Sequence, residues 1–379
     1  MTSVWDDVVG QEPAVEVLRH AIEDPAAMTH AWLLTGPPGS GRSNAARAFA
    51  AALQCATGGC GVCHDCTTTL RGLHPDVTVV ATEGVVIRAE TARPLVELAQ
   101  RAPSQGRHRV IIIEDADRLN DTSGNALLKA IEEPAGRTVW LLCAPSPQDV
   151  LVTIRSRSRS VALRVPPVDA VAALLVSRDG IDPAVAAIAA RAAQSHVGIA
   201  RRLARDPEAR ARRKDVLGIA AKIRGVGDAV LAAGELVETA QADAKAATEQ
   251  RDADERAELL RSMGAEGAAT LPPALRTQVR QLEEDQKRRA TRSQRDVLDR
   301  AMVDLLSLYR DVLVVQLGAG VELVNIEHEE SVRTLAAAST PEQTLRRMDA
   351  IGQARTRLAG NVAPLLAVEA MAVALRPQG

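Results

Sequence analysis

Short apolar runs and amphipathic segments alternate over the first part of the chain. The runs 109–113 and 139–143 are almost uninterruptedly apolar, as in strands covered on both faces of a parallel sheet. Residues 31–34 and 77–81 predict two further short strands. Before and between these strands, helices are predicted at 13–22, 44–53, 88–102 and 120–133. The alternation predicts an α/β fold in which helices cover both faces of a parallel sheet.

The pattern becomes helical after the pair Pro166-Pro167, which marks a domain boundary. Three short helices are expected beyond it, at 169–177, 183–194 and 199–205. We therefore expect an α/β domain over residues 1–166 and a small helical domain over residues 167–206.

Long charged helices are expected over the remainder, 207–379, as an all-helical domain. Residues 226–262 are acidic, 264–273 interrupt the helix, and 274–300 are basic, with Lys287, Arg288 and Arg289 in succession. We favour a solvated antiparallel hairpin over about 226–300. The alternative is a DNA-binding arm, against which the absence of interleaved aromatic residues argues.

Two further helical signals follow the charged part. The apolar stripe over 297–313 recurs at helical spacing and predicts a buried helix. Thr340, followed by Pro341 and Glu342, predicts the start of another helix, and 362–375 form the last, after the break at Gly360-Asn361. These helices fit an isolated bundle or an oligomerisation domain, and the sequence does not separate the two.

Composition and charge narrow the function classes. The 379 residues carry a net charge of −2 with both signs mixed, so no whole-chain attraction to nucleic acid is indicated. The chain has only three Trp, one Tyr and one Phe, so few aromatic side chains are present on which bases could stack. No apolar run approaches the roughly 20 residues that span a bilayer, and the N-terminus lacks a signal-peptide pattern. We expect a cytoplasmic protein without membrane contact.

A glycine-rich stretch, GPPGSGRS, follows the first predicted strand and precedes a helix. It matches the phosphate-binding P-loop pattern G-x-x-x-x-G-K-[ST] at Gly36, Gly41 and Ser43, with Gly39 as an additional glycine. It departs from the pattern at Arg42, where a lysine would contact the β- and γ-phosphates, and a guanidinium is not a neutral replacement. The stretch therefore predicts the shape of a nucleotide loop and leaves ATP and Mg²⁺ binding open.

Two acids, Glu114 and Asp115, end the apolar strand 109–113. In P-loop ATPases an acid at this place holds Mg²⁺ and the next one orients the attacking water. The usual order there is Asp then Glu, and the shorter Asp115 would displace a water-activating carboxylate by about 1.5 Å. The alternative is a pair of solvated acids at a strand end.

Four cysteines, Cys55, Cys60, Cys63 and Cys66, follow the helix after the loop with gaps of four, two and two residues. Thiolates at this spacing can close a tetrahedral Zn²⁺ site, and with no open coordination position the zinc would be structural. A redox pair or unconnected thiols are the alternatives, although a redox motif needs two cysteines and not four. Cys143 is expected to be a buried small hydrophobe.

Four arginines, at 155, 157, 159 and 164, follow the last predicted strand. They could form a solvated face, or one of them could reach the nucleotide of a neighbouring protein.

The loop, the four-cysteine insertion, the acid-ended strand, the LLKAIEEP helix and the Ser-Arg segment occur here in the order found in bacterial DNA polymerase III clamp-loader subunits. Residues 5–205 closely resemble this AAA+ family of delta prime and tau/gamma proteins, and the helical remainder does so more loosely. The resemblance implies an AAA+ P-loop domain, a helical lid and an all-helical collar, in the residue ranges given above.

The chain departs from the family's hydrolytic machinery at four places. In these departures it resembles the delta prime branch of the family. They are Arg42, the order Glu114-Asp115, Ala144-Pro145 at the first sensor, and Gly198 where a second sensor arginine would stand. The resemblance implies little or no ATP hydrolysis by this chain, although a catalytically active tau/gamma-like ATPase or an ATP-binding, non-hydrolysing subunit remains an alternative.

Further roles follow from the resemblance. Ser156-Arg157-Ser158 matches the family's Ser-Arg-Cys motif except at its last residue, which implies that Arg157 is an arginine finger acting in trans. The implied partners are delta and tau/gamma in a hetero-pentamer, with the sliding clamp and primer-template DNA met through this complex. The chain would then work in DNA replication, within the DNA polymerase III holoenzyme. A zinc-dependent DNA-binding protein is the remaining alternative.

Overall fold

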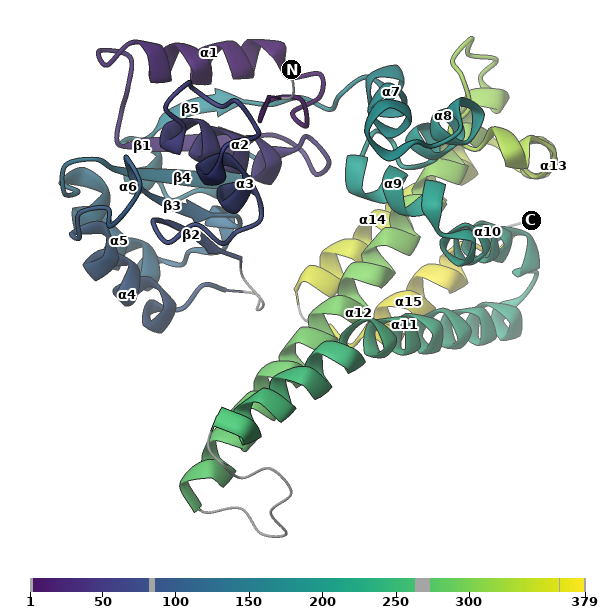
Figure 1. Cartoon of the computed structure of the whole chain (residues 1–379). Coiled ribbons are helices and arrows are strands. Elements are labelled where there is room, and N and C mark those ends of the chain that lie inside the picture. The colour runs from purple at the N-terminus through teal and green to yellow at the C-terminus, as the bar shows by residue number, and fades with distance from the viewer. Residues whose placement is uncertain (1–2, 82–85, 263–272, 361, 378–379) are drawn as a thin grey trace. The chain divides into compact units, whose positions relative to one another are not determined.

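The computed structural model describes residues 3–81, 86–262, 273–360 and 362–377 (Figure 1). The chain divides into two compact units, Met1–Arg205 and Asp206–Gly379. Within the described ranges no helix is long and apolar enough to cross a membrane. The predicted interruption at 264–273 falls, up to residue 272, outside the described residues, as does Asn361.

The first unit is built on a five-stranded sheet with the order β2-β3-β4-β1-β5. Its strands are β1 (Ala31–Thr35), β2 (Val77–Val80), β3 (Arg109–Ile113), β4 (Thr138–Ala144) and β5 (Arg159–Ala162). Every pairing between neighbouring strands is parallel. The four predicted strands and the parallel α/β architecture are confirmed.

The fifth strand was missed by the sequence analysis, which assigned its residues to an arginine-rich segment. In β1, β3 and β4 every residue is buried, and their sequences are apolar except at the end residues Thr35, Arg109 and Thr138. β5 lies at the edge of the sheet and buries only Val161 of its four residues. A strand with one buried side chain produces no apolar run, and its pattern resembles that of a loop.

Helices cover both faces of the sheet (Figure 1). They are α1 (Glu12–Glu23), α2 (Arg42–Gln54), α3 (His64–Leu70), α4 (Ala89–Ala99), α5 (Asp121–Glu132) and α6 (Val152–Arg155), with short 3₁₀ turns at Ala116–Arg118 and Pro147–Asp149. Leu34 and Ile112 belong to a core with α1 and α2, whereas Leu33 and Ile111 belong to a second core with α4 and α5. Alternate side chains of one strand thus face opposite helix layers, as a sheet covered on both faces requires.

Three helices complete the first unit: α7 (Val168–Asp179), α8 (Pro183–Ala192) and α9 (Val197–Arg205). The carboxylate of Asp182 accepts hydrogen bonds from the first backbone N–H groups of α8. Arg178, Arg201 and Arg205 surround the buried carboxylate of Asp179, which joins α7 to α9.

The second unit consists of helices and the loops between them in its described residues. It contains α10 (Pro207–Lys222), α11 (Val226–Ser262), α12 (Pro273–Gln316), α13 (Glu329–Ala337), α14 (Pro341–Ala359) and α15 (Pro364–Ala374), with a 3₁₀ turn at Ile326–His328. The predicted stripe on α12 is confirmed, because Met302, Leu305, Tyr309 and Val312 lie in the core of this unit. The capping residue Thr340 begins α14 as predicted.

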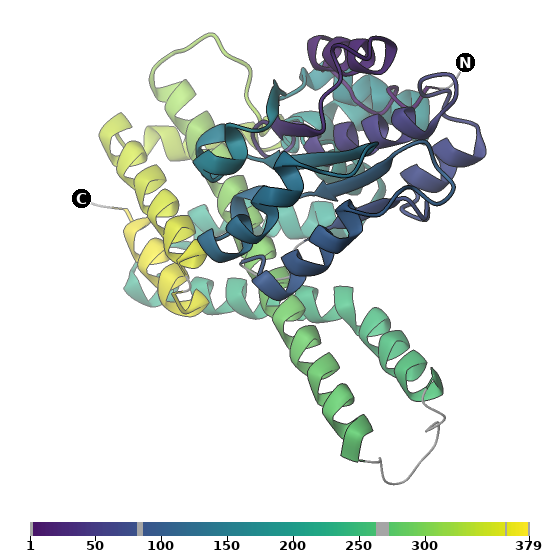
Figure 2. The same cartoon turned by 90° about the vertical axis from the view of Figure 1, so that its left-hand side faces the viewer.

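The charged segments form an antiparallel pair of long helices, α11 and α12, as the favoured interpretation predicted (Figure 2). Towards the far end of the pair, Leu275 and Val279 pack against Leu259 and Leu260. Arg289 of α12 lies 2.9 Å from the carboxylate of Asp252 on α11. Acidic and basic residues of the two helices therefore neutralise each other across the pair.

Candidate functional site

The P-loop pattern lies between β1 and α2, as predicted, and its glycines are required by the backbone. Gly39 and Gly41 have φ values of +88° and +84°, which other residues rarely adopt. A Cβ atom on Gly36 would lie 2.5 Å from the carbonyl oxygen of Leu163. The turn that curls a P-loop is therefore present, whatever the side chain at position 42.

The loop ends at the start of α2, a place where proteins often bind anions. Gly41 is the N-cap, and it offers no side chain to the first backbone N–H groups of the helix. The first turn contains no acidic residue. The hydroxyl of Ser40 is buried and has no hydrogen-bond partner among the described residues. The loop thus retains groups suited to a phosphate.

Arg42 turns back onto the loop that precedes it. Its Nη1 donates a hydrogen bond to the carbonyl oxygen of Gly36, at the other end of the loop. A lysine at this position would reach forward to a phosphate as a compact charge. The Arg42 guanidinium instead closes the loop upon itself.

The strand-end acid Glu114 already has a cationic partner. Nη2 of Arg47, on α2, lies 2.8 Å from Oε1 of Glu114. The next acid, Asp115, lies 3.9 Å from Nε of Arg118. Burial raises the pKa of the nearby Asp117, and the charge of Asp115 adds to the rise. A divalent cation at Glu114 would therefore have to compete with the guanidinium of Arg47.

Arg47 was missed by the sequence analysis. Apart from Arg42 at its first position, it is the one charged residue in the sequence of α2, RSNAARAFAAALQ. A single cationic side chain on an alanine-rich helix beside the sheet could have been used to predict an ion pair with an acid at a strand end.

The turn between α8 and α9 lies against the P-loop. A Cβ atom on Gly39 would come within 3.1 Å of Cβ and 3.3 Å of Cδ2 of His196. Gln194 and Ser195, just before it, have positive φ values of 49° and 65°, which is strained for residues with side chains. Gly198 lies beside the imidazole of His196. The place assigned to a second sensor thus presents a histidine next to the loop.

Arg157 lies at the surface of the first unit, after α6. Its Nε donates to the carboxylate of Glu132 on α5, and its Nη1 donates to the carbonyl oxygen of Thr153 at 2.8 Å. The side chain is 36% exposed. A second molecule could therefore approach this guanidinium, which Glu132 holds in one orientation.

The neighbouring arginines bind the backbone of their own unit. Arg155 donates to the carbonyl oxygen of Pro147, and Arg159 donates to that of Ala27. The guanidinium of Arg159 also lies over the ring of Trp32, 5.1 Å from its centroid. These two side chains stabilise the local fold.

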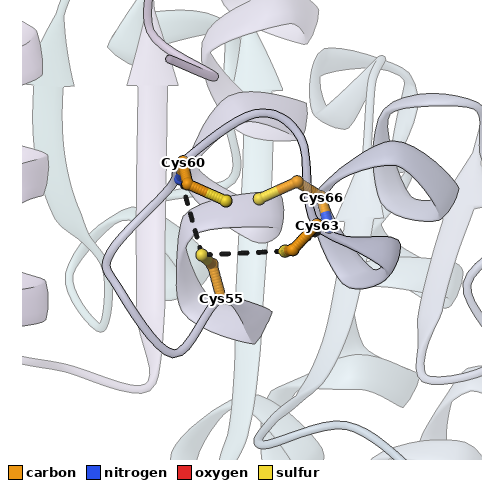
Figure 3. Close-up of side chains that lie close together, drawn as sticks. All are labelled: Cys55, Cys60, Cys63 and Cys66. Carbon is orange, nitrogen blue, oxygen red and sulfur yellow. Dashed lines mark hydrogen bonds between the residues drawn. The ribbon is translucent and has the colours of Figure 1, made fainter. Parts of the chain in front are cut away.

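The four predicted cysteine ligands converge (Figure 3). The sulfur atoms of Cys55, Cys60, Cys63 and Cys66 all lie within 4.8 Å of one another, and those of Cys55 and Cys63 are 3.8 Å apart. Four sulfurs at about 2.3 Å from one Zn²⁺ form a tetrahedron with edges of about 3.8 Å. The cluster could thus hold a metal such as zinc, with no position left for a substrate.

Backbone amides surround the sulfur of Cys55. Burial opposes its ionisation, but hydrogen bonds from the Thr57 hydroxyl and from the N–H groups of Cys60, Thr57 and Gly59 outweigh burial and lower the pKa to about 5. Such donors stabilise a thiolate, the form that binds metal. Burial raises the pKa of Cys143, outside the cluster, to about 12, which agrees with the predicted small hydrophobe.

Comparisons with known proteins agree with this geometry. A family model described as DNA polymerase III, delta subunit, matches residues 10–167. The gamma/tau subunit of Mycobacterium tuberculosis is 36% identical over 177 residues, which cover 45% of this chain and 30% of that protein. The delta' subunit of Pseudomonas aeruginosa is 39% identical over 147 residues, covering 37% and 45%. The delta' subunit of Bacillus subtilis is 30% identical over 164 residues, covering 42% and 50%.

The chain thus spans half or less of the length of these relatives. A solved gamma subunit-related protein of Thermotoga maritima has a TM-score of 0.42 and 15% identity, and the match covers 96% of this chain and 98% of that one. The residues that the family model matches include the sheet and the P-loop. Residues 10–167 of the chain are therefore similar to the DNA polymerase III delta' and gamma/tau subunits.

Proposed function

We propose that the chain is a clamp-loader subunit of the delta prime type, with little or no ATP hydrolysis of its own. Its partners would be delta and tau/gamma subunits in a hetero-pentamer that places a sliding clamp on primer-template DNA during replication. Relatives named delta' and gamma/tau support the complex. In this proposal residues 1–166 are the AAA+ domain, 167–206 the lid and 207–379 the collar.

The ion pair between Arg47 and Glu114 carries the proposal of weak hydrolysis. Hydrolysis by a P-loop ATPase needs Mg²⁺ held near the acidic strand end and a carboxylate that orients water. Glu114 is paired with a guanidinium at 2.8 Å, and Arg42 is hydrogen-bonded to its own loop. Both the metal-holding acid and the phosphate-binding cation are thus engaged within the chain.

A direct assay of the purified chain tests this proposal. We expect phosphate release from ATP at the background rate, and the same rate in Ser43→Ala. Turnover like that of an ordinary AAA+ ATPase, abolished by Ser43→Ala, would show that the site is an active enzyme.

Nucleotide binding without hydrolysis is a second candidate function. The left-handed Gly39 and Gly41 and the uncapped start of α2 support it, because they preserve the backbone donors of a P-loop. Titration of the chain with a fluorescent ATP analogue tests binding separately from turnover.

We propose that Arg157 serves the ATP site of a neighbouring subunit. Its exposed guanidinium and its hydrogen bond to Glu132 support this role, since an arginine finger must be accessible and oriented. Such a finger accelerates phosphoryl transfer by about 10³-fold or more.

The test is a reconstituted loader that contains tau/gamma and delta. Arg157→Ala should leave assembly intact and remove the activity of one ATP site, and Arg157→Lys should restore little of it because lysine lacks the planar fork. The control is Arg101→Ala, at an exposed arginine of the same unit. An unchanged ATPase rate in Arg157→Ala dismisses the assignment.

We propose that the cysteine cluster holds one structural Zn²⁺. The convergence of the four sulfurs supports it, whereas a redox pair would need only two. Metal analysis of the purified protein should find about one zinc per chain, and Cys63→Ser should lower the zinc affinity strongly. Protein that is fully active in assembly without any metal would contradict the proposal.

A further inference from the structure

The first residues of the chain are buried without belonging to a helix or strand. The N-terminal segment, residues 3–11, consists of turns and irregular backbone. Val4, Trp5 and Val8 are nevertheless buried in the core that α1 and α2 share. A segment with no ladder of its own needs anchors elsewhere to keep three apolar side chains in place.

One anchor of the N-terminal segment is Gly59. Its carbonyl oxygen accepts hydrogen bonds from the backbone N–H of Val4, at 3.1 Å, and from the hydroxyl of Ser3, at 3.3 Å. Packing is close at the same point, because a Cβ atom on Gly59 would lie 2.7 Å from Cγ2 of Val4 and 3.4 Å from Nε1 of Trp5.

Gly59 belongs to the turn between two of the cysteines. Its neighbour Cys60 donates its backbone N–H to the sulfur of Cys55 at 3.4 Å, and Gly58 donates to the carbonyl oxygen of Cys55 at 3.3 Å. Gly59 itself has φ +112°, which only glycine adopts readily. A metal bound to Cys55 and Cys60 would fix both ends of this turn, and with them the direction of the Gly59 carbonyl.

The other end of the N-terminal segment reaches the P-loop and α7. The side-chain amide of Gln11 donates to the carbonyl oxygen of Ser40 at 3.1 Å and accepts from the backbone N–H of Arg164 at 3.1 Å. Asp7 lies 2.6 Å from Nη1 of Arg178 on α7. The segment therefore connects the cysteine turn with both the nucleotide loop and the helices that follow the sheet.

We propose that the four-cysteine cluster, acting through Gly59, positions the N-terminal segment against the P-loop and α7. This inference rests on the zinc proposed above, and it gives that metal a defined task. Loss of the metal frees the 55–60 turn, Gly59 no longer holds Val4 and Trp5, and the segment loosens while the sheet stays folded. Gly59 is then a positioning residue for the nucleotide loop.

Hydrogen–deuterium exchange of the full chain tests the proposal, before and after removal of zinc with a chelator. We expect amides of residues 3–11 to exchange about tenfold faster without metal. Peptides from the buried strands β3 and β4 should exchange at the same rate in both samples. Unchanged exchange in residues 3–11 overturns the proposal. Faster exchange in β3 and β4 also overturns it, because the metal would then support the whole unit.

Two variants test the contact without touching the thiols. Gly59→Ala should keep its zinc and still speed exchange of residues 3–11 by about tenfold, because the new Cβ has no room beside Val4. Gly72→Ala is the matched control, since Gly72 has φ +72° and nothing within 4 Å of an added Cβ. Its exchange in residues 3–11 should match the wild type. If Gly59→Ala yields no soluble protein, Val4→Ala replaces it, with an expected increase of about threefold.

The outcomes separate the two proposals. Protein purified without zinc would contradict the metal proposal and this inference together. Bound zinc whose removal leaves residues 3–11 protected, with wild-type exchange in Gly59→Ala and Val4→Ala, would contradict the positioning role and leave the structural zinc standing.

Discussion

Arg47 and Glu114 are 67 positions apart in the sequence, yet Nη2 of one lies 2.8 Å from Oε1 of the other. The pair joins the helix after the P-loop to the acidic end of β3. In a hydrolysing site this carboxylate would be available to Mg²⁺. Here the charge of the acid is balanced before any cation arrives.

Removal of Arg47 should therefore increase the effect of Mg²⁺ on nucleotide binding. In Arg47→Ala we expect Mg²⁺ to tighten binding of a fluorescent ATP analogue about threefold more than in the wild type, since partly exposed ion pairs contribute about 0.2 to 1 kcal/mol. Arg47→Lys keeps the charge and is the control. An equal Mg²⁺ effect in Arg47→Ala and the wild type would mean that the pair does not limit cation binding.

Arg42→Lys should restore a phosphate contact without restoring catalysis. A lysine cannot close the loop through the fork that Arg42 directs at Gly36, and its ammonium is suited to the β- and γ-phosphates. We expect ATP to bind about tenfold more tightly in calorimetry. Phosphate release should stay at background, because Glu114 is still paired. A variant that gains turnover would show that Arg42 alone suppresses hydrolysis. Arg42→Ala controls for loss of the guanidinium.

The parts of the structure that could be predicted from the sequence are those formed by residues close together along the chain. β1, β3 and β4 bury every residue, so their burial is visible in the sequence as apolar runs that only an end residue of each strand interrupts. The glycines of the loop and the spacing of the cysteines also describe neighbours along the chain, and the structure places both sets as expected. The functional roles expected for these motifs came from the resemblance to AAA+ proteins.

Contacts between distant segments were not predictable in this way. The Arg47–Glu114 pair and the approach of His196 to Gly39 join residues that no local pattern connects. Elements with few buried residues were missed as well. β5 buries Val161 alone, and α13, which no sequence pattern predicted, buries only Val332.

Thr340 should stabilise the second unit through its helix cap. Its hydroxyl accepts from the N–H of Gln343 at 3.3 Å, and the Gln343 side chain accepts from the N–H of Thr340 at 3.1 Å. Thr340→Ala should lower the unfolding free energy by about 1 kcal/mol, whereas Thr340→Ser should cost little. The single tyrosine, Tyr309, is buried in this unit and its fluorescence can follow urea unfolding. Equal midpoints for the Ala and Ser variants would contradict the role of the cap.

The buried carboxylate of Asp76 should make the first unit sensitive to acid. It accepts hydrogen bonds at 2.7 Å from the backbone N–H groups of Ser104, Gln105 and Gly106, and it lies 3.0 Å from Nη2 of Arg109. Burial by itself would raise its pKa, but the backbone donors outweigh burial and lower the pKa from 3.8 to about 2.

The sign of the pH effect follows from that direction. The unfolded chain binds a proton at Asp76 more readily than the folded one, so the stabilisation is complete well above pH 4 and is lost as the pH falls towards 2. In Asp76→Asn this part of the acid sensitivity should disappear. At pH 7 the variant should be less stable by about 3 kcal/mol, because an amide turns an N–H₂ group towards the backbone donors and leaves Arg109 without its counter-charge.

Urea unfolding at several pH values, followed by tryptophan fluorescence, measures both effects, since Trp5, Trp32 and Trp140 all lie in the first unit. Asp169→Asn, at an exposed carboxylate of the same unit, is the control and should shift the midpoint little. If the wild type and Asp76→Asn lost stability in parallel between pH 5 and about pH 2.5, the ordinary titration of other carboxylates would account for the acid response. The backbone donors around Asp76 would then not be the cause of the acid response through a lowered pKa.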